Sequence, residues 1–312
     1  MSTIRIANAP CSWGSLEFEG LEGKGVRYGQ MLDELRDAGY DGTELGDWGY
    51  MPTTADELHA QLAARGLTML GAFVPVALKE AKAHAAGVQE SLKVARLLAG
   101  VAEKGGYDRQ PFVVLADDNG TDAVRTANAG RIRSDMSLSD AQWAVFARGA
   151  EHVARTVKSE TGLRTVFHHH CAGYVERPDE IARLLDLTDG DLLGLVFDTG
   201  HYAYGAADDD SEVVLKGLER FADRIWYMHF KDCHAGVADK ARREGWDYFE
   251  AVRQGVFCEL GRGCVDFPAV LDWLRQRNYD GWVVVEQDVL PGMGSPKESA
   301  QRNREYLRAK GV

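Results

Sequence analysis

Four short hydrophobic segments of this sequence each end in side chains that can bind a metal ion. The segments are TVFHHH, LGLVFDTGH, IWYMHF and WVVVEQD, and the residues concerned are His168, His169, His170, Asp198, His201, His229 and Glu286. A single residue of this kind is commonly a helix cap or an ion-pair partner, but four segments in succession indicate one shared site. Two imidazoles and two carboxylates suit one divalent ion, with coordination positions left open for a substrate.

These segments are the last four of eight apolar runs that we expect to be β-strands. The runs are 4–7, 42–45, 68–74, 112–115, 165–168, 193–197, 225–229 and 282–285. Stretches with the helical spacing of apolar residues lie between them. Runs such as FVVL and VVVE are apolar on both faces, which is typical of a parallel sheet covered on both sides. Eight β/α units predict an α/β fold, a single-domain (β/α)8 TIM barrel over residues 1–312.

A barrel of this kind brings the carboxyl ends of its strands together around one pocket, so residues far apart in sequence can share a site. The alternative is an open doubly wound sheet, which normally has a glycine-rich phosphate loop after its first strand. The sequence NAPCSWGSLEFEG contains no G-x-G-x-x-G motif, and this favours the barrel. Two connections, 117–137 and 232–265, are unusually long, and we expect both on the catalytic face.

Composition excludes several classes of partner. The chain has 36 Lys and Arg against 48 Asp and Glu, a net charge of −12, which argues against nucleic-acid binding because that affinity depends on neutralising phosphates. The start, MSTIRIANAP, does not resemble a signal peptide, and no run reaches the roughly 18 apolar residues of a membrane span. Five cysteines without a Cys-x-x-Cys pair indicate reduced thiols. We therefore expect a soluble, cytoplasmic protein.

The motifs FDTGH, MHFKD, GRGCVDFPAVLDWL and GWVVVEQD resemble those of the xylose-isomerase-like TIM barrels, in particular the branch of inosose dehydratases and sugar epimerases or isomerases. The resemblance covers nearly the whole chain, from NAPCSWG through GYDGTELG to the last helix. It implies one divalent metal held by Glu, Asp, His and Glu at the ends of strands five to eight. Matched by motif, the last three ligands are Asp198, His229 and Glu286.

The first ligand departs from the pattern of the epimerases in this family. Where they have Glu-x-His, this chain has His168 in the glutamate position and His170 in the histidine position. Epimerisation requires an acid/base group on each face of the sugar, and of the two family glutamates only Glu286 remains. Elimination of water fits this asymmetric pair better. Epimerisation or isomerisation is the alternative, because imidazole also transfers protons.

The resemblance implies a β-elimination from a polyhydroxylated ketone such as 2-keto-myo-inositol. The metal, with Mn²⁺ or Co²⁺ expected before Zn²⁺ or Mg²⁺, would polarise the ketone and stabilise the enolate. Glu286 is the expected base, and His201 or His170 the expected acid, although His201 could instead serve only the helix that follows Asp198. Lys231 is expected to bind a substrate oxygen or to pair with Glu286 or Asp232.

The first half of the chain offers further candidates for substrate binding. Glu44, at the end of the second strand, is expected to reach the pocket or to form a structural ion pair. Trp13, Trp48 and Phe73 could form an apolar wall for a sugar ring, or belong to the core. Asp117 could bind hydroxyl groups or cap a turn. With no phosphate-binding loop, the expected substrate is an unphosphorylated keto-sugar or keto-inositol. The protein is expected to form a homo-oligomer. A further alternative to an enzyme is a sugar-binding subunit without catalytic activity.

Overall fold

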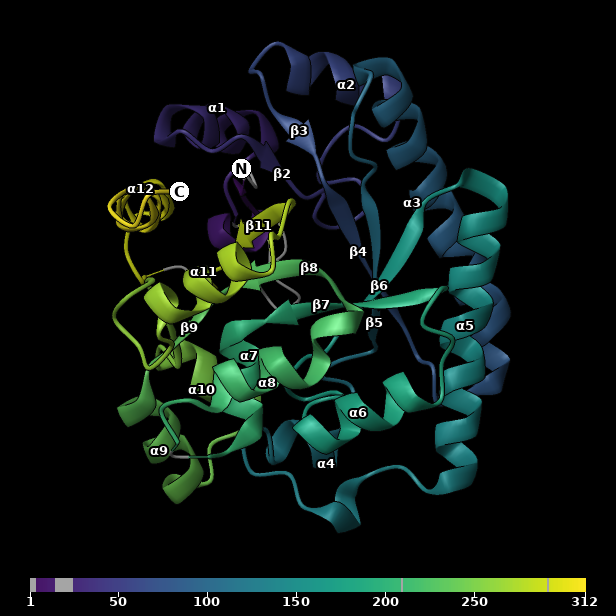
Figure 1. The fold of residues 1–312 in the computed structure, drawn as a ribbon, viewed down its shortest axis with the longest axis vertical. Coiled ribbons are helices and arrows are strands. Elements are labelled where there is room, and N and C mark those ends of the chain that lie inside the picture. The colour runs from purple at the N-terminus through teal and green to yellow at the C-terminus, as the bar shows by residue number, and fades with distance from the viewer. Residues whose placement is uncertain (1–3, 15–24, 209, 291) are drawn as a thin grey trace.

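The computed structural model describes residues 4–14, 25–208, 210–290 and 292–312. Parallel strands form its centre and helices surround them (Figure 1). The strands of the large sheet are β1 Arg5–Asn8, β2 Gly42–Thr43, β3 Thr68–Met69, β4 Gly71–Val76, β5 Phe112–Asp117, β6 Arg164–His168, β7 Leu193–Asp198, β8 Ile225–Phe230 and β11 Trp282–Val285. They are ordered β3-β2-β1-β11-β8-β7-β6-β5-β4.

The sheet closes on itself through one chain segment, 68–76, which is divided into β3 and β4. The β3 half pairs with β2 and the β4 half pairs with β5, so the segment joins the two ends of the strand order. At the division, Leu70 donates to the carbonyl of Thr43 at 3.0 Å and accepts from the amide of Phe112 at 2.8 Å. The predicted (β/α)8 barrel is therefore confirmed, and the open doubly wound sheet is excluded.

The helices follow the strands in the predicted alternation. They are α1 Tyr28–Ala38, α2 Ala55–Ala63, α3 His84–Gly105, α4 Ala123–Ala127, α5 Asp140–Thr161, α6 Pro178–Asp186, α7 Thr199–Ala206, α8 Val213–Phe221, α9 Ala235–Glu244, α10 Tyr248–Arg253, α11 Phe267–Gln276 and α12 Pro296–Arg308. Ser295 and Asp266 cap α12 and α11, because their side chains accept backbone N–H bonds at the starts of these helices. Among the described residues, no helix is both long and apolar enough to span a membrane.

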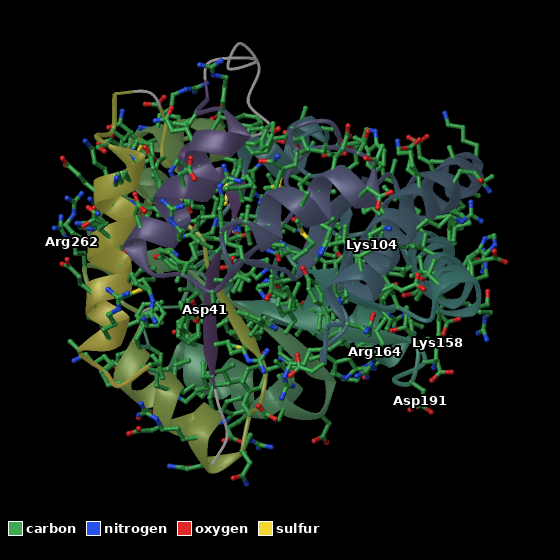
Figure 2. The ribbon with its side chains drawn as sticks, turned by 90° about the horizontal axis from the view of Figure 1, so that it is seen from above. Asp41, Lys104, Lys158, Arg164, Asp191 and Arg262 are labelled. Carbon is green, nitrogen blue, oxygen red and sulfur yellow. The ribbon has the colours of Figure 1, made fainter. Side chains whose placement is uncertain are left out.

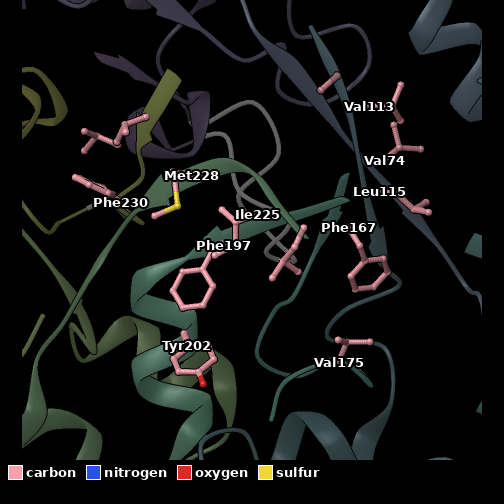
Figure 3. Packing of buried hydrophobic residues seen from close by; sticks show 14 of the residues in the cluster. Val74, Val113, Leu115, Phe167, Val175, Phe197, Tyr202, Ile225, Met228 and Phe230 are labelled. Atoms are coloured by element: carbon pink, nitrogen blue, oxygen red, sulfur yellow. The ribbon is translucent and has the colours of Figure 1, made fainter. Parts of the chain in front are cut away.

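The alternation of side chains along each strand fills two apolar layers. Val114, Val166 and Val196 face one another inside the barrel. Their neighbours in sequence, such as Phe167 and Phe197, pack between the sheet and the helices (Figure 3). Charged side chains occupy the outside, where Lys104, Lys158 and Arg262 extend into solvent (Figure 2). The same alternation decides which residues at the ends of the strands enter the barrel.

Candidate active site

Four side chains converge at the carboxyl ends of β6, β7, β8 and β11. They are His168, Asp198, His229 and Glu286, and one possible ligand atom from each lies within 4.8 Å of the others. Ligand bonds of about 2.0–2.2 Å place donor atoms up to about 4.4 Å apart around one ion, so the cluster has nearly the size of a mononuclear site. Asp198 Oδ2 is fully buried and has no hydrogen-bond partner. Such an unsatisfied acceptor, 3.8 Å from His168 Nε2, fits a metal ligand.

The three consecutive histidines occupy three different environments. His168 shares the inward parity of Val166 and lines the pocket, whereas His169 shares the outward parity of Phe167. The His169 ring is fully buried beneath the helices, and its Nε2 accepts the backbone N–H of Asp198 at 3.1 Å. His169 therefore turns away from the pocket and binds the backbone at the end of the neighbouring strand. His170 lines the pocket again.

Asp198 also begins the next helix. Its Oδ1 accepts the backbone N–H of His201 at 2.8 Å and so caps α7, which leaves Oδ2 directed toward the cluster. The His201 ring lies behind His170, with the ring centroids 3.8 Å apart, and does not line the pocket. Its Nδ1 accepts the amide of Cys171 at 3.4 Å. His201 therefore lies in the first turn of α7, where it binds backbone groups, and not among the residues that line the pocket.

Glu44 holds His229 in a defined orientation. Its Oε1 lies 2.9 Å from His229 Nε2, while His229 Nδ1 lies 3.2 Å from Glu286 Oε1. A histidine that donates one ring N–H to a carboxylate presents its other nitrogen to a metal, with its tautomer fixed. Burial disfavours the ionised form of Glu286, but His229 and Lys231 beside it hold its pKa well below the usual range. Glu286 is therefore an ionised carboxylate at neutral pH.

Lys231 is a buried cation between two carboxylates. Its Nζ lies 3.1 Å from Asp288 Oδ1 and 3.4 Å from Glu286 Oε2. Burial opposes the charge of Lys231, but Asp288 and Glu286 outweigh it and raise the pKa of the ammonium well above its usual range. The other predicted partner, Asp232, accepts four backbone N–H bonds instead. Lys231 is thus charged and close to the base.

His168 and Glu286 of the cluster line a cavity of about 130 Å³. Its polar lining includes Glu44, His168, His170, Lys231, Glu286 and Asp288. Phe73, Tyr248 and Phe249 supply aromatic walls, and the Phe73 ring meets His168 edge to face at 6.1 Å. Both long connections contribute, because Asn119 comes from 117–137 and Tyr248 from 232–265. Together with Asp47, the lining has four acidic side chains and one cation, Lys231. This balance of charge suits a neutral polyol better than an anion.

Three predicted substrate contacts lie elsewhere. The Trp13 side chain is 1% exposed and donates its Nε1–H to Glu34 at 2.8 Å, so it belongs to the core. Trp48 is 41% exposed and stacks with the Lys93 ammonium outside the cavity. Asp117 accepts the amide of Tyr174 at 3.0 Å and lines a neighbouring hollow. Trp13 thus occupies the core position that was its alternative, whereas Trp48 lies in neither the core nor the cavity, and Asp117 binds the backbone of a distant loop rather than the next turn.

Sequence reasoning missed Asp47, Asn119, Tyr248 and Asp288 among the polar residues that line the cavity. Asp288 lies two positions after Glu286, and Lys231 lies two positions after His229. The equal spacing on neighbouring strands could have indicated an ion pair between Asp288 and Lys231. Tyr248 has no comparable signal, because it sits on a short helix within a long connection. Its place over the cavity depends on contacts between loops that are distant in sequence.

The fold and the cluster together define a TIM barrel with a candidate site for one ion at the carboxyl end of its strands. The chain belongs to the xylose isomerase-like TIM barrel family, whose model matches residues 32–310. Among curated relatives, the inosose dehydratase of Geobacillus kaustophilus (strain HTA426) is 31% identical over 307 residues, 98% of this chain and 94% of the relative. The predicted family resemblance is confirmed.

Two solved structures share the fold. The probable 3-DHS dehydratase AsbF, involved in petrobactin synthesis in Bacillus anthracis, gives a TM-score of 0.69 at 12% identity, over 98% of this chain and 99% of that one. The IOLI protein with a bound zinc atom gives 0.67 at 15% identity, over 98% of each chain. At these identities the likeness establishes the architecture alone.

Proposed function

We propose that this protein is a metal-dependent dehydratase that removes water from 2-keto-myo-inositol or a closely related keto-sugar. The observation that carries the proposal is the cluster of His168, Asp198, His229 and Glu286. Two of its members, His168 and Glu286, line a cavity together with Lys231. Relatives named inosose dehydratase, aligned over nearly the full chain, support a reaction of the dehydratase kind. The lining of the cavity supports an unphosphorylated substrate.

A β-elimination next to a ketone requires a polarised carbonyl, a base for the α-proton and an acid for the leaving oxygen. A divalent ion held by the four clustered residues supplies Lewis acidity at the carbonyl when bound. Glu286, ionised and at the edge of the cavity, takes the proton from the carbon next to the ketone. Lys231 donates hydrogen bonds to substrate oxygens while Asp288 balances its charge. Phe73 packs against the apolar face of the ring.

The donor set restricts the metal without selecting one. Two imidazoles and two carboxylates accommodate Mn²⁺, Co²⁺ or Zn²⁺, whereas Mg²⁺ prefers oxygen ligands. We propose Mn²⁺ or Co²⁺ as the working ion. The fit rests on the buried, unsatisfied Oδ2 of Asp198 and on the His229 ring that Glu44 orients.

A ketose epimerase is the second candidate function. The observation that favours it is His170, which lines the same cavity as Glu286 and could return a proton to the opposite face of the substrate. The two functions differ in product. A dehydratase forms an enolised dione that absorbs ultraviolet light, whereas an epimerase exchanges solvent deuterium into the substrate without loss of water.

The test combines metal analysis with both assays. Wild-type protein, Asp198→Ala and Glu286→Ala are purified and their bound metal is measured, with Asp272→Ala on the exposed face of α11 as the matched control. We expect stoichiometric metal in the wild type and control, and loss of metal and of ketone dehydration in the two cluster variants. Unchanged metal content in both cluster variants would contradict the proposed site. Deuterium exchange without water release would favour the epimerase.

A further inference from the structure

The connection between β8 and α11 closes over the cavity from a fixed base. Within it lie α9, α10 and a two-stranded antiparallel ribbon formed by β9 Asp232–Cys233 and β10 Phe257–Cys258. The Asp232 carboxylate accepts four backbone N–H bonds of 2.8–3.1 Å, from Cys233, Gly261, Gly263 and Val265. Both ends of the connection are therefore held at one side chain.

The far end of this connection is fastened to the other long one. The Arg131 guanidinium donates to the carbonyl of Trp246 at 2.8 Å, and Arg242 Nε donates to the carbonyl of Gly130 at 2.9 Å. Asp247 then caps α10 by accepting the amide of Glu250 at 2.7 Å. The first residue of α10, Tyr248, is thereby held over the cavity.

Tyr248 meets His170 in a geometry that fixes the direction of their hydrogen bond. His170 Nδ1 lies 2.6 Å from the carbonyl oxygen of Cys171, and because a carbonyl only accepts, this nitrogen carries the proton. Nε2 of the neutral ring is therefore an acceptor. The Tyr248 hydroxyl, 3.5 Å from Nε2, is the donor of a long hydrogen bond. At this length the hydrogen bond is weak, so the hydroxyl can turn its proton from Nε2 to a substrate oxygen in the cavity.

Three carboxylates of the cavity are engaged with basic partners. Asp288 accepts hydrogen bonds from Lys231, Glu286 forms an ion pair with the same ammonium group, and Glu44 accepts a hydrogen bond from His229. The only hydroxyl group among the described residues that line the cavity belongs to Tyr248. Burial raises the pKa of Tyr248 well above its ordinary value, so the phenol keeps its proton at neutral pH until a stronger base, such as a departing hydroxide, takes it.

We propose that Tyr248 is the catalytic acid that protonates the leaving oxygen and that His170 is the residue that positions its hydroxyl. The inference rests on the proposed dehydratase function. Glu286 removes the α-proton, the electron pair of that C–H bond forms the C=C bond, and the C–O bond at the next carbon breaks. The departing oxygen takes the Tyr248 proton and leaves as water. Glu286 then loses its proton to solvent and Tyr248 regains one before the next turnover.

The test separates the loss of water from the removal of the α-proton. In Tyr248→Phe, loss of water from 2-keto-myo-inositol is expected to fall about 10²–10⁴-fold, the usual contribution of a general acid. Exchange of the α-proton with D₂O, which needs only the base, is expected to stay within about threefold of wild type. The matched control is Tyr279→Phe, whose hydroxyl bonds the carbonyl of Trp282 at the opposite end of the barrel.

A second readout depends on the leaving group. With an analogue that carries fluorine in place of the departing hydroxyl, the Tyr248→Phe defect should shrink to less than about tenfold, because fluoride leaves without full protonation. The role of His170 is checked in the same way. His170→Gln, which keeps an acceptor, should retain more water loss than His170→Ala, and both should treat the fluoro analogue nearly alike.

Each outcome bears on one proposal or on both. Unchanged water loss in Tyr248→Phe overturns the assignment of the acid and leaves the dehydratase function intact. A parallel fall of exchange, water loss and fluoride loss also overturns it, because that pattern indicates a structural role. A wild-type enzyme that exchanges the α-proton but releases no water overturns both proposals.

Discussion

Glu44→Gln should weaken the metal site without dismantling it. Glu44 Oε1 lies 2.9 Å from His229 Nε2, and both side chains are buried. Glutamine keeps the size and an acceptor oxygen but loses the charge, so His229 becomes a poorer ligand. Loss of a carboxylate that orients a ligating histidine commonly costs 10–100-fold in metal affinity. This factor corresponds to about 1.4–2.7 kcal/mol, less than the loss of a ligand should cost.

The measurement is calorimetric titration of the metal-free protein with Mn²⁺, and separately with Co²⁺. Wild type, Glu44→Gln and Asp198→Ala are compared under one buffer and pH. Glu34→Gln is the matched control, because Glu34 also accepts a ring N–H bond, from Trp13 at 2.8 Å, but lies outside the cavity. Its affinity for either ion should equal that of wild type.

Two results would refute the role given to Glu44. An affinity equal to that of wild type would show that its bond to His229 does not influence the metal. An affinity as low as that of Asp198→Ala would show that Glu44 binds the ion directly. Only an intermediate loss, with the control unchanged, fits a carboxylate that orients its neighbouring histidine.

Two further predictions concern stability. Arg125 and Glu180 form a buried ion pair with two hydrogen bonds, of 2.8 and 2.7 Å. Arg125→Ala should therefore lower the free energy of unfolding, measured in urea, by about 3–5 kcal/mol. Arg183→Ala, which breaks an exposed pair with Asp140, should lower it by less than about 1 kcal/mol, and equal losses in the two variants would contradict the prediction. Burial raises the pKa of Asp117 to about 6, above its value of about 3.8 in the unfolded chain. The folded state therefore binds the carboxyl proton more tightly than the unfolded state does. The stabilisation that this proton gives the fold is present at low pH and is lost as pH rises from about 4 to 6. Relative to Asp117→Asn, wild type should lose up to about 3 kcal/mol between pH 4 and 7, and a pH-independent difference would show that Asp117 does not carry the effect.

Sequence patterns were enough to predict the barrel because its strands are encoded locally. Each of the eight apolar runs overlaps a strand, and the run at 68–74 overlaps both β3 and β4. The direction of the side chains at the ends of the strands follows from the same pattern. The parity of Val166 places His168 in the pocket and His169 beneath the helices, without any knowledge of tertiary contacts.

The parts of the site that could not be predicted depend on contacts between segments distant in sequence. Trp13 enters the core because Glu34 on α1 accepts its indole N–H, and Trp48 stays outside because Lys93 on α3 stacks on it. Tyr248 reaches the cavity only because the two long connections bind each other. The family match and the relatives confirm the predicted kind of protein, while the individual site roles stay predictions.

The Asp232 carboxylate gathers the start of the connection after β8 and its return within one set of four hydrogen bonds. The two ends of the segment between these points, 234–260, are therefore held together at one side chain, while Arg131 and Arg242 bind this cassette to the connection 117–137. Protein engineers could exchange this cassette between members of the family while the four clustered strand-end residues stay in place. Natural selection has the same freedom, so substrate preference in such barrels can diverge through the cassette while the strand ends keep their chemistry.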